Sequence, residues 1–144
     1  MTKKLKYVIL ENESLIIEYY CGKFYVNDLI DFKKRIGKDK KFKPTYNVIS
    51  DIRELEFLFK MPEVKQYVDF LVTNQKQVGI RKTTMITDTP NQVITSLSFD
   101  ILKGTLPINF KVYSSLESAY AFLGLSLSDG ELVDSHLIKL KNAQ

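Results

Sequence analysis

Strand-like and helix-like segments alternate along this chain after a hairpin at its start, and this order restricts the folds open to it. Residues 6–12 and 14–22 are rich in β-branched and aromatic side chains, and the turn signal NES lies between them. Because strands separated by helices need crossover connections, the later strands are expected to be parallel. The pattern predicts an α/β fold with a mixed, mainly parallel sheet of about five strands, an N-terminal β-hairpin and about four helices. The remaining strands are predicted at 45–50, 83–87 and 109–113, and the helices at 27–37, 61–77, 89–103 and 114–124.

The length of 144 residues fits one domain. We assign residues 1–125 to this domain and treat residues 126–144 as a C-terminal extension. Within the extension, HLIKLK could form a strand edge or a short amphipathic helix. It could pack on the domain or on a second subunit, which leaves a homodimer open.

Several kinds of catalytic and cofactor site are missing from the sequence. Cys21 is the only cysteine and His136 the only histidine, so there is no intramolecular disulfide and no Cys/His cluster for a metal. No GxGxxG, P-loop or HExxH motif occurs. We therefore predict no cofactor and no metal site. The apolar run at residues 7–10 is too short for a signal peptide or a membrane span, so a cytoplasmic location is expected.

Two segments resemble STAS domains of the anti-sigma-factor-antagonist (SpoIIAA-like) type, most closely the small stand-alone bacterial proteins of this kind. The first is CGKFYVNDLIDFKKRIGKDKKFKPTYNVISDIREL (21–55), in which a Gly closes a strand, VNDL opens a helix, FKP precedes the next strand and SDIREL ends it. The second is FKVYSSLESAYAFLGL (110–125), which resembles the family's C-terminal strand and helix. The resemblance covers about residues 5–125. It implies a fold of stacked strand–helix units and a non-enzymatic binding or regulatory role.

The resemblance also points to a regulatory switch whose key residue this chain lacks. In the best-known members of the family, a Ser or Thr at the start of the next helix is phosphorylated by a partner kinase, and the added charge breaks a protein complex. The resemblance aligns LFKMPE (58–63) with that turn, and no Ser, Thr or Tyr occurs between Arg53 and Lys65. The switch hydroxyl is therefore missing here.

Polar residues follow the predicted strands, at the ends where ligands bind in open α/β sheets. Asp51 and Arg53 come directly after the strand at 45–50, and Asp88 follows the strand at 83–87. One interpretation is a polar pocket, in which Arg53 holds a carboxylate or phosphate and Asp51 or Asp88 orients a donor or acts in acid–base catalysis. The other is structural: Asp51 closes a turn, Asp88 lies at the start of a helix, and Arg53 pairs with Asp51. We favour the structural interpretation and keep all three as candidate contacts.

Two further segments carry candidate contacts. LEFLFKMPEV (55–64) is apolar in a predicted loop, so Phe59 and Met61, with the neighbouring Lys60, are candidates for contact with a partner or ligand. Residues 33–43 hold seven basic residues and one acid, which fits either a solvated helix end or an anion site. Aromatic residues are scarce in this segment, which argues against nucleic acid. The candidate anion patch consists of Lys33, Lys34, Arg35, Lys38, Lys40, Lys41 and Lys43.

The function we predict is a non-enzymatic STAS-like module that recognises a protein partner or a small ligand, without the family's phospho-switch serine. Two alternatives stay open. One is an enzyme with a polar site at the strand ends, formed by Asp51, Arg53 and Asp88. The other is an anion or nucleic-acid binder that uses the basic segment 33–43, which binding that weakens steeply with salt would favour.

Overall fold

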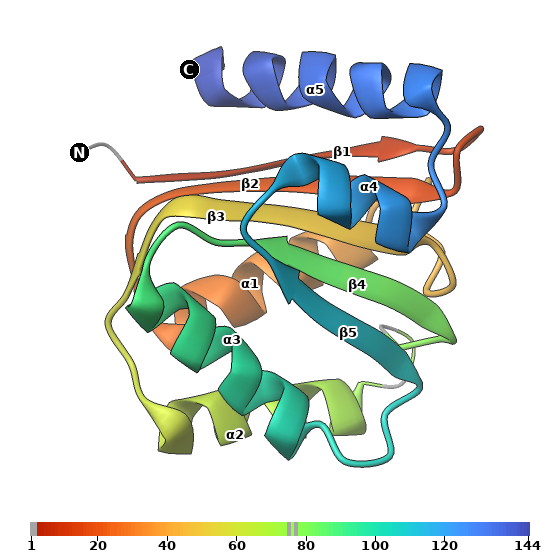
Figure 1. Ribbon diagram of the computed structural model, residues 1–144. Coiled ribbons are helices and arrows are strands. Elements are labelled where there is room, and N and C mark those ends of the chain that lie inside the picture. The colour runs from red at the N-terminus through yellow and green to blue at the C-terminus, as the bar shows by residue number, and fades with distance from the viewer. Residues whose placement is uncertain (1–2, 75, 77) are drawn as a thin grey trace.

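A central five-stranded sheet carries helices on both of its faces (Figure 1). The structure is a computed structural model, and it describes residues 3–74, 76 and 78–144. The strands are β1 (Lys4–Leu10), β2 (Leu15–Phe24), β3 (Asn47–Phe57), β4 (Arg81–Ile86) and β5 (Ile108–Tyr113). The helices are α1 (Val26–Gly37), α2 (Met61–Thr73), α3 (Pro90–Leu102), α4 (Leu116–Leu123) and α5 (Leu127–Asn142).

The sheet is mixed and mainly parallel, as the sequence predicts. Its strand order is β1-β2-β3-β4-β5. The first two strands form an antiparallel hairpin, and every later pair of neighbours is parallel. The predicted fold class is therefore confirmed, with one difference. The described part of the chain has five helices instead of about four, because the C-terminal extension forms α5.

The helices divide into two groups, one on each face of the sheet. Helices α1, α2 and α3 cover one face, and α4 and α5 cover the other (Figure 1). Alternate residues of one strand therefore enter different cores: in β2, Ile16 packs with the first group and Ile17 with the second. Burial on both faces explains why β2 is apolar along almost its whole length.

Strand β3 is longer than predicted. It continues to Phe57, so Asp51 and Arg53 lie inside the strand and not after its end. The strand persists because residues 54–57 still pair with residues 21–24 of β2. The loop predicted within 55–64 is correspondingly short, since Met61 already begins α2.

The helix predicted for 61–77 is shorter than expected. It ends at Thr73, where Asn74 follows as the C-terminal cap. Residues 75 and 77, which the prediction included, lie outside the described residues.

The C-terminal extension forms a helix that packs on the domain. Helix α5 lies along β1 and β2, on the same side of the sheet as α4 (Figure 1). Val133 and Leu137 are buried in the core on this side, where they join Leu15 and Ile17 of β2. HLIKLK is therefore part of a helix, and the strand-edge alternative is wrong.

One buried hydroxyl gives a direct test of the packing around β4. Thr84 is fully buried, and its hydroxyl has no hydrogen-bond partner among the described residues. An unpaired buried hydroxyl costs about 1–3 kcal/mol, so the isosteric change Thr84→Val should raise the free energy of unfolding by about 1 kcal/mol. Urea denaturation measures this. Thr105→Val, at an exposed position, should shift the same quantity by less than about 0.5 kcal/mol. A loss of stability in T84V would mean that the hydroxyl is bonded in solution.

Candidate functional site

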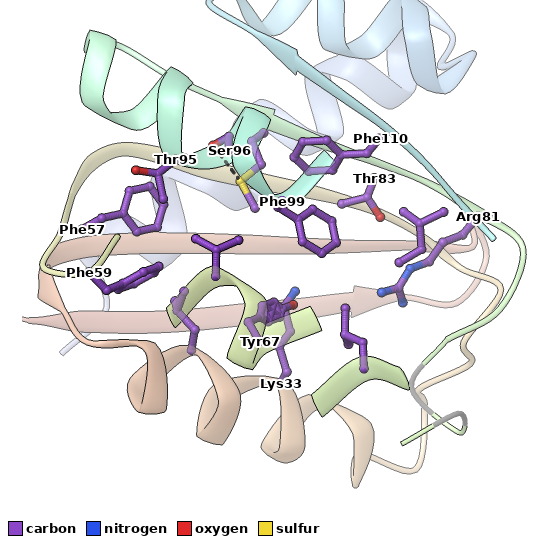
Figure 2. Close-up of a pocket in the computed structure, with 15 residues that line it drawn as sticks. Lys33, Phe57, Phe59, Tyr67, Arg81, Thr83, Thr95, Ser96, Phe99 and Phe110 are labelled. Carbon is purple, nitrogen blue, oxygen red and sulfur yellow. Dashed lines mark hydrogen bonds between the residues drawn. The ribbon is translucent and has the colours of Figure 1, made fainter. Parts of the chain in front are cut away.

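A cavity lies between the sheet and helices α2 and α3 (Figure 2). Its volume is about 50 Å³. One buried water needs about 10–15 Å³, so the cavity has room for several waters or for part of a small ligand. The wall is mainly apolar and aromatic, and it includes Phe57, Phe59, Tyr67, Met85, Phe99 and Phe110.

A buried ion pair borders this cavity. Glu18 of β2 is only 1% exposed. Its carboxylate accepts hydrogen bonds from Lys33 Nζ at 2.5 and 2.7 Å, from the Tyr20 hydroxyl at 2.7 Å and from Ser50 Oγ at 2.8 Å. Lys33, from α1, also forms part of the cavity wall. Glu18 therefore fixes the position of a cation at the edge of the cavity.

The two charges of this pair compensate each other. Burial opposes the ionisation of Glu18, but Lys33 and the two hydroxyl donors outweigh it and lower the pKa of Glu18 below its usual value. Glu18 is therefore ionised at neutral pH. Burial lowers the pKa of Lys33, an effect that Glu18 opposes and the nearby Arg81 reinforces. The positive charge of Arg81 thus raises the electrostatic potential that Lys33 experiences.

Arg81, the first residue of β4, brings a second cation to the cavity wall. It is 9% exposed, and its Nε has no hydrogen-bond partner among the residues that the structure describes. None of the ion pairs among the described residues includes it. Burial lowers the pKa of Arg81, and Tyr67 and Glu18 oppose this shift. Because arginine stays protonated in proteins, the cavity wall carries a buried positive charge that forms no ion pair within the described part of the chain.

Arg81 and the pair Phe57 and Phe59 lie at opposite ends of the cavity (Figure 2). Figure 2 shows Arg81 and Thr83 on one side and Phe57 and Phe59 on the other. The strands agree with this view, since Arg81 begins β4 and Phe57 ends the parallel neighbour β3. The hydroxyl of Thr83 is buried without a hydrogen-bond partner in the described structure. Arg81 Nε and the Thr83 hydroxyl, both unpaired among the described residues, therefore lie at one end of a mainly apolar space that Lys33, Thr95 and Ser96 also line.

A second, more open hollow of about 430 Å³ lies on the opposite face of the sheet, beside α5. It brings together the three residues of the predicted polar pocket, from β3 and from the end of β4. Its lining consists of Tyr19, Asp51, Arg53, Glu54, Asp88, Leu137, Ile138 and Lys141.

Most charged residues of this hollow are paired with one another. Arg53 donates from Nε and Nη2 to the two carboxylate oxygens of Asp51, at 2.9 and 2.8 Å, and this raises the pKa of Arg53. Glu54 accepts a hydrogen bond from the Tyr19 hydroxyl at 2.7 Å and forms an ion pair with Lys141 at 2.8 Å. These contacts occupy the side chains of Asp51, Arg53 and Glu54. They favour the structural interpretation of Asp51 and Arg53.

A bulge in β3 brings two consecutive charged residues into the hollow. Tyr19 pairs with Asp51, but Cys21 pairs with Glu54, so this interval is one residue longer in β3 than in β2. Consecutive residues of a regular strand point to opposite faces. At the bulge, Arg53 and Glu54 instead both line the hollow.

Comparison with solved structures finds a similar fold. The chain is similar to an uncharacterised protein of the DUF3478 family with a SpoIIAA-like fold from Shewanella loihica PV-4, at a TM-score of 0.55 and 12% sequence identity. The match covers 85% of this chain and 96% of that one. This chain has a SpoIIAA-like fold. No protein-family model matches the sequence, and no curated protein matches it.

In this SpoIIAA-like fold, the three candidate contact residues near the start of α2 differ in their exposure to solvent. Phe59 is buried and lines the cavity, with its ring centroid 5.1 Å from that of Phe57 in an edge-on contact. Contact of Phe59 with a ligand in this cavity stays a prediction, and its burial beneath the end of β3 leaves little surface for a partner protein. Lys60 is exposed, and Met61 is about half exposed at 47%. Contact of Met61 and Lys60 with a partner stays a prediction.

The residues of the candidate anion patch also differ in exposure, since one member is largely buried and the others are exposed. Lys33 belongs to the buried pair with Glu18 and is therefore set apart from the exposed basic residues of the segment. Arg35 donates to the carbonyl oxygen of Leu5 at 2.8 Å and lies over the ring of Phe32. Anion binding by the remaining members stays a prediction. The exposed members are Lys34, Arg35, Lys38, Lys40, Lys41 and Lys43.

Two further properties of the described structure concern metals and membranes. Within residues 3–74, 76 and 78–144, no group of three or more His, Cys, Asp or Glu side chains is arranged to hold a metal ion. No described helix is both long and apolar enough to cross a bilayer.

Sequence analysis missed Glu18, Arg81 and Thr83. Glu18 could have been noticed because it is an acid within the apolar run LIIEYY. A charged residue in a strand that is buried on both faces needs a partner. Lys33 carried a similar signal, because it lies between Leu29 and Ile36 at helical spacing and therefore borders the buried face of α1.

Proposed function

We propose that this protein is a non-enzymatic SpoIIAA-like binding module whose small, partly apolar ligand occupies the cavity beneath β3, β4 and β5. The observation that carries the proposal is the cavity itself, whose apolar wall contains a buried Arg81 without an ion-pair partner among the described residues. Ligand sites in proteins have this character: mostly apolar walls with a few polar groups that fix orientation. A cavity that served only as packing would be expected to exclude an unpaired cation.

The sequence of α3 supports the same proposal. Its buried residues include Thr95 and Ser96, which line the cavity, while its exposed residues include Ile94, Leu97 and Ile101. This reverses the usual pattern, in which a surface helix buries its apolar side. Hydroxyl groups on the inner side are useful where a helix covers a binding site, and less useful where it covers a filled core.

A binding role without catalysis is favoured by the state of the second hollow. Acid–base catalysis there would need a carboxylate that is free to exchange a proton with a substrate. Two of the three carboxylates of the hollow are held: both oxygens of Asp51 accept hydrogen bonds from Arg53, and Glu54 is bound by Tyr19 and Lys141. The third, Asp88, is exposed just after the end of β4 and would have to act without a second free carboxylate. Because LFKMPE lacks a phosphorylatable residue, the ligand binding that we propose does not depend on phosphorylation at this turn.

Binding in the cavity can be tested with hexan-1-ol as a probe. In a two-dimensional NMR titration, we expect saturable shift changes concentrated at lining residues such as Met85 and Thr95. The variant Ser96→Leu adds bulk to the cavity wall and should weaken binding about tenfold or more, equivalent to about 1.4 kcal/mol. Ser135→Leu makes the same change at an exposed position of α5 and should leave the affinity unchanged. Equal affinities in the two variants would contradict binding in this cavity.

A further inference from the structure

The chemical class of the ligand is indicated by the unpaired polar groups of Arg81 and Thr83 in the cavity wall. Arg81 is about nine-tenths buried, and Figure 2 shows its guanidinium group directed from the start of β4 into the space bordered by Tyr67 and Lys33. Within residues 3–74, 76 and 78–144, its Nε lacks a hydrogen-bond partner, and so does the hydroxyl of Thr83, two residues further along the same strand. Residues two apart in a strand point to the same face, so both groups are presented to one site.

The buried charges around the cavity do not sum to zero. Glu18 and Lys33 form a pair, which leaves the charge of Arg81 as a net single positive charge among the three. A ligand with one negative charge would neutralise this site. A second negative charge on the ligand would face Glu18, whose field already reaches Arg81. The balance therefore favours a monoanion over a dianion such as a phosphate monoester.

The arrangement of hydrogen-bond donors at Arg81 and Thr83 also indicates which anionic group would bind there. A guanidinium group presents parallel N–H donors that match the two oxygens of a carboxylate, and the Thr83 hydroxyl adds a third donor. Phe57 and Phe59 lie at the opposite end of the cavity, where their rings offer apolar surface to the rest of the ligand (Figure 2).

We infer that the cavity binds an amphiphilic monocarboxylate, with its carboxylate at Arg81 and Thr83 and its apolar body directed toward Phe57 and Phe59. This inference rests on the proposed function, because it assigns the chemical class of the ligand that the same cavity takes. Lys33 contributes to the attraction through its charge while it stays bound to Glu18.

The first experiment compares three probes of equal chain length by isothermal titration calorimetry: hexanoate, hexan-1-ol and hexyl phosphate. We expect hexanoate to bind at least about tenfold more tightly than hexan-1-ol, the effect of one charge-assisted contact. Hexyl phosphate should bind more weakly than hexanoate. Equal binding of hexanoate and hexan-1-ol would overturn the carboxylate inference and leave the proposed function intact. Binding of none of the three would overturn both, and tighter binding of hexyl phosphate would overturn the single-charge argument.

The second experiment locates the carboxylate with variants. Arg81→Met should weaken hexanoate binding about tenfold or more and leave hexan-1-ol binding nearly unchanged. Thr83→Val should weaken hexanoate binding by a smaller factor. Lys82→Met is the matched control, because Lys82 is the neighbouring cation on β4 and its Nζ donates to the carbonyl oxygen of Phe122 in α4 at 3.0 Å. Equal losses of hexanoate affinity in R81M and K82M would overturn the assignment.

A stability measurement separates a ligand-binding role of Arg81 from a structural one. Because Arg81 has no ion-pair partner among the described residues, ligand-free R81M should unfold at a urea concentration equal to or higher than that of the unchanged protein. Hexanoate should raise the melting temperature of the unchanged protein and have little effect on R81M. A ligand-free R81M that is clearly less stable would assign Arg81 to the packing of the sheet and overturn the inference.

Discussion

The variant Glu18→Gln is expected to lower the free energy of unfolding by about 3–5 kcal/mol, because it leaves Lys33 as an uncompensated buried charge. Glutamine keeps the size of the side chain and still offers an oxygen to Tyr20 and Ser50, so the change isolates the charge. Lys33 cannot turn to solvent without leaving its site, since its side chain is only 12% exposed. Urea denaturation at pH 7 measures the loss.

The matched control for this variant is Glu54→Gln. Glu54 also pairs with a lysine, Lys141, but the two side chains are 32% and 59% exposed. An exposed pair of this kind contributes about 1 kcal/mol or less. A cost for E18Q no larger than that for E54Q would contradict the buried pair. Replacing Glu18 and Lys33 together with methionine should recover much of the stability that E18Q loses, since no charge is then left unpaired.

The dependence of stability on pH gives a second check on Glu18. Its pKa is lowered in the folded protein, so its contribution is fully present above the unfolded pKa, about 4.3, and is lost as the pH falls through the lower folded pKa. The unchanged protein should therefore lose stability more steeply than E18Q when the pH is lowered from about 4.3. Parallel profiles for the two proteins would show that Glu18 does not titrate as the fold predicts.

The variant Leu137→Ala is expected to lower the free energy of unfolding by about 2–5 kcal/mol, the usual effect of removing a buried leucine side chain. Leu137 is 6% exposed in the core between α5 and β2, where it joins Ile17 and Val133. The prediction tests whether α5 belongs to the domain or is a loosely attached tail. Thermal or urea unfolding of the whole chain measures it.

Ile138→Ala provides the control for this prediction within the same helix. Ile138 is the next residue, but it is 61% exposed. Its replacement should change the free energy of unfolding by less than about 0.5 kcal/mol. If L137A and I138A have the same small effect, α5 does not pack on β1 and β2 in solution.

Local sequence patterns determined the fold class of this protein. The hairpin at the start, the strand–helix alternation and the amphipathic periods of α1 and α2 each depend on residues that are close in the chain. Because a helix between two strands leaves few ways to continue a sheet, these patterns were enough to predict a mixed, mainly parallel sheet. The helix α5 was less clear, since Val133 and Leu137 become a buried side only when β1 and β2 are present.

Only the tertiary structure determined which residues come together in the cavity and in the second hollow. The end of β3 depended on its pairing with residues 21–24, and the bulge opposite Tyr19 and Cys21 turned Glu54 to the same face as Arg53. No local pattern encodes such a shift in register, because it arises from the match between two strands far apart in sequence.

Contacts between residues far apart in the sequence also determine which charged residues are buried and which are paired. The sequence placed Lys33 in a basic surface segment, and only the packing of α1 against β2 brought it to Glu18. From the sequence alone, Arg81 is an ordinary cation at the start of a strand. Only the packing of α2 and α3 on the sheet buries it beside Thr83. Charge type and spacing are local properties of a sequence. Burial and the presence or absence of a partner depend on residues dozens of positions apart, and these decide whether a charge is solvated, paired or open to a ligand.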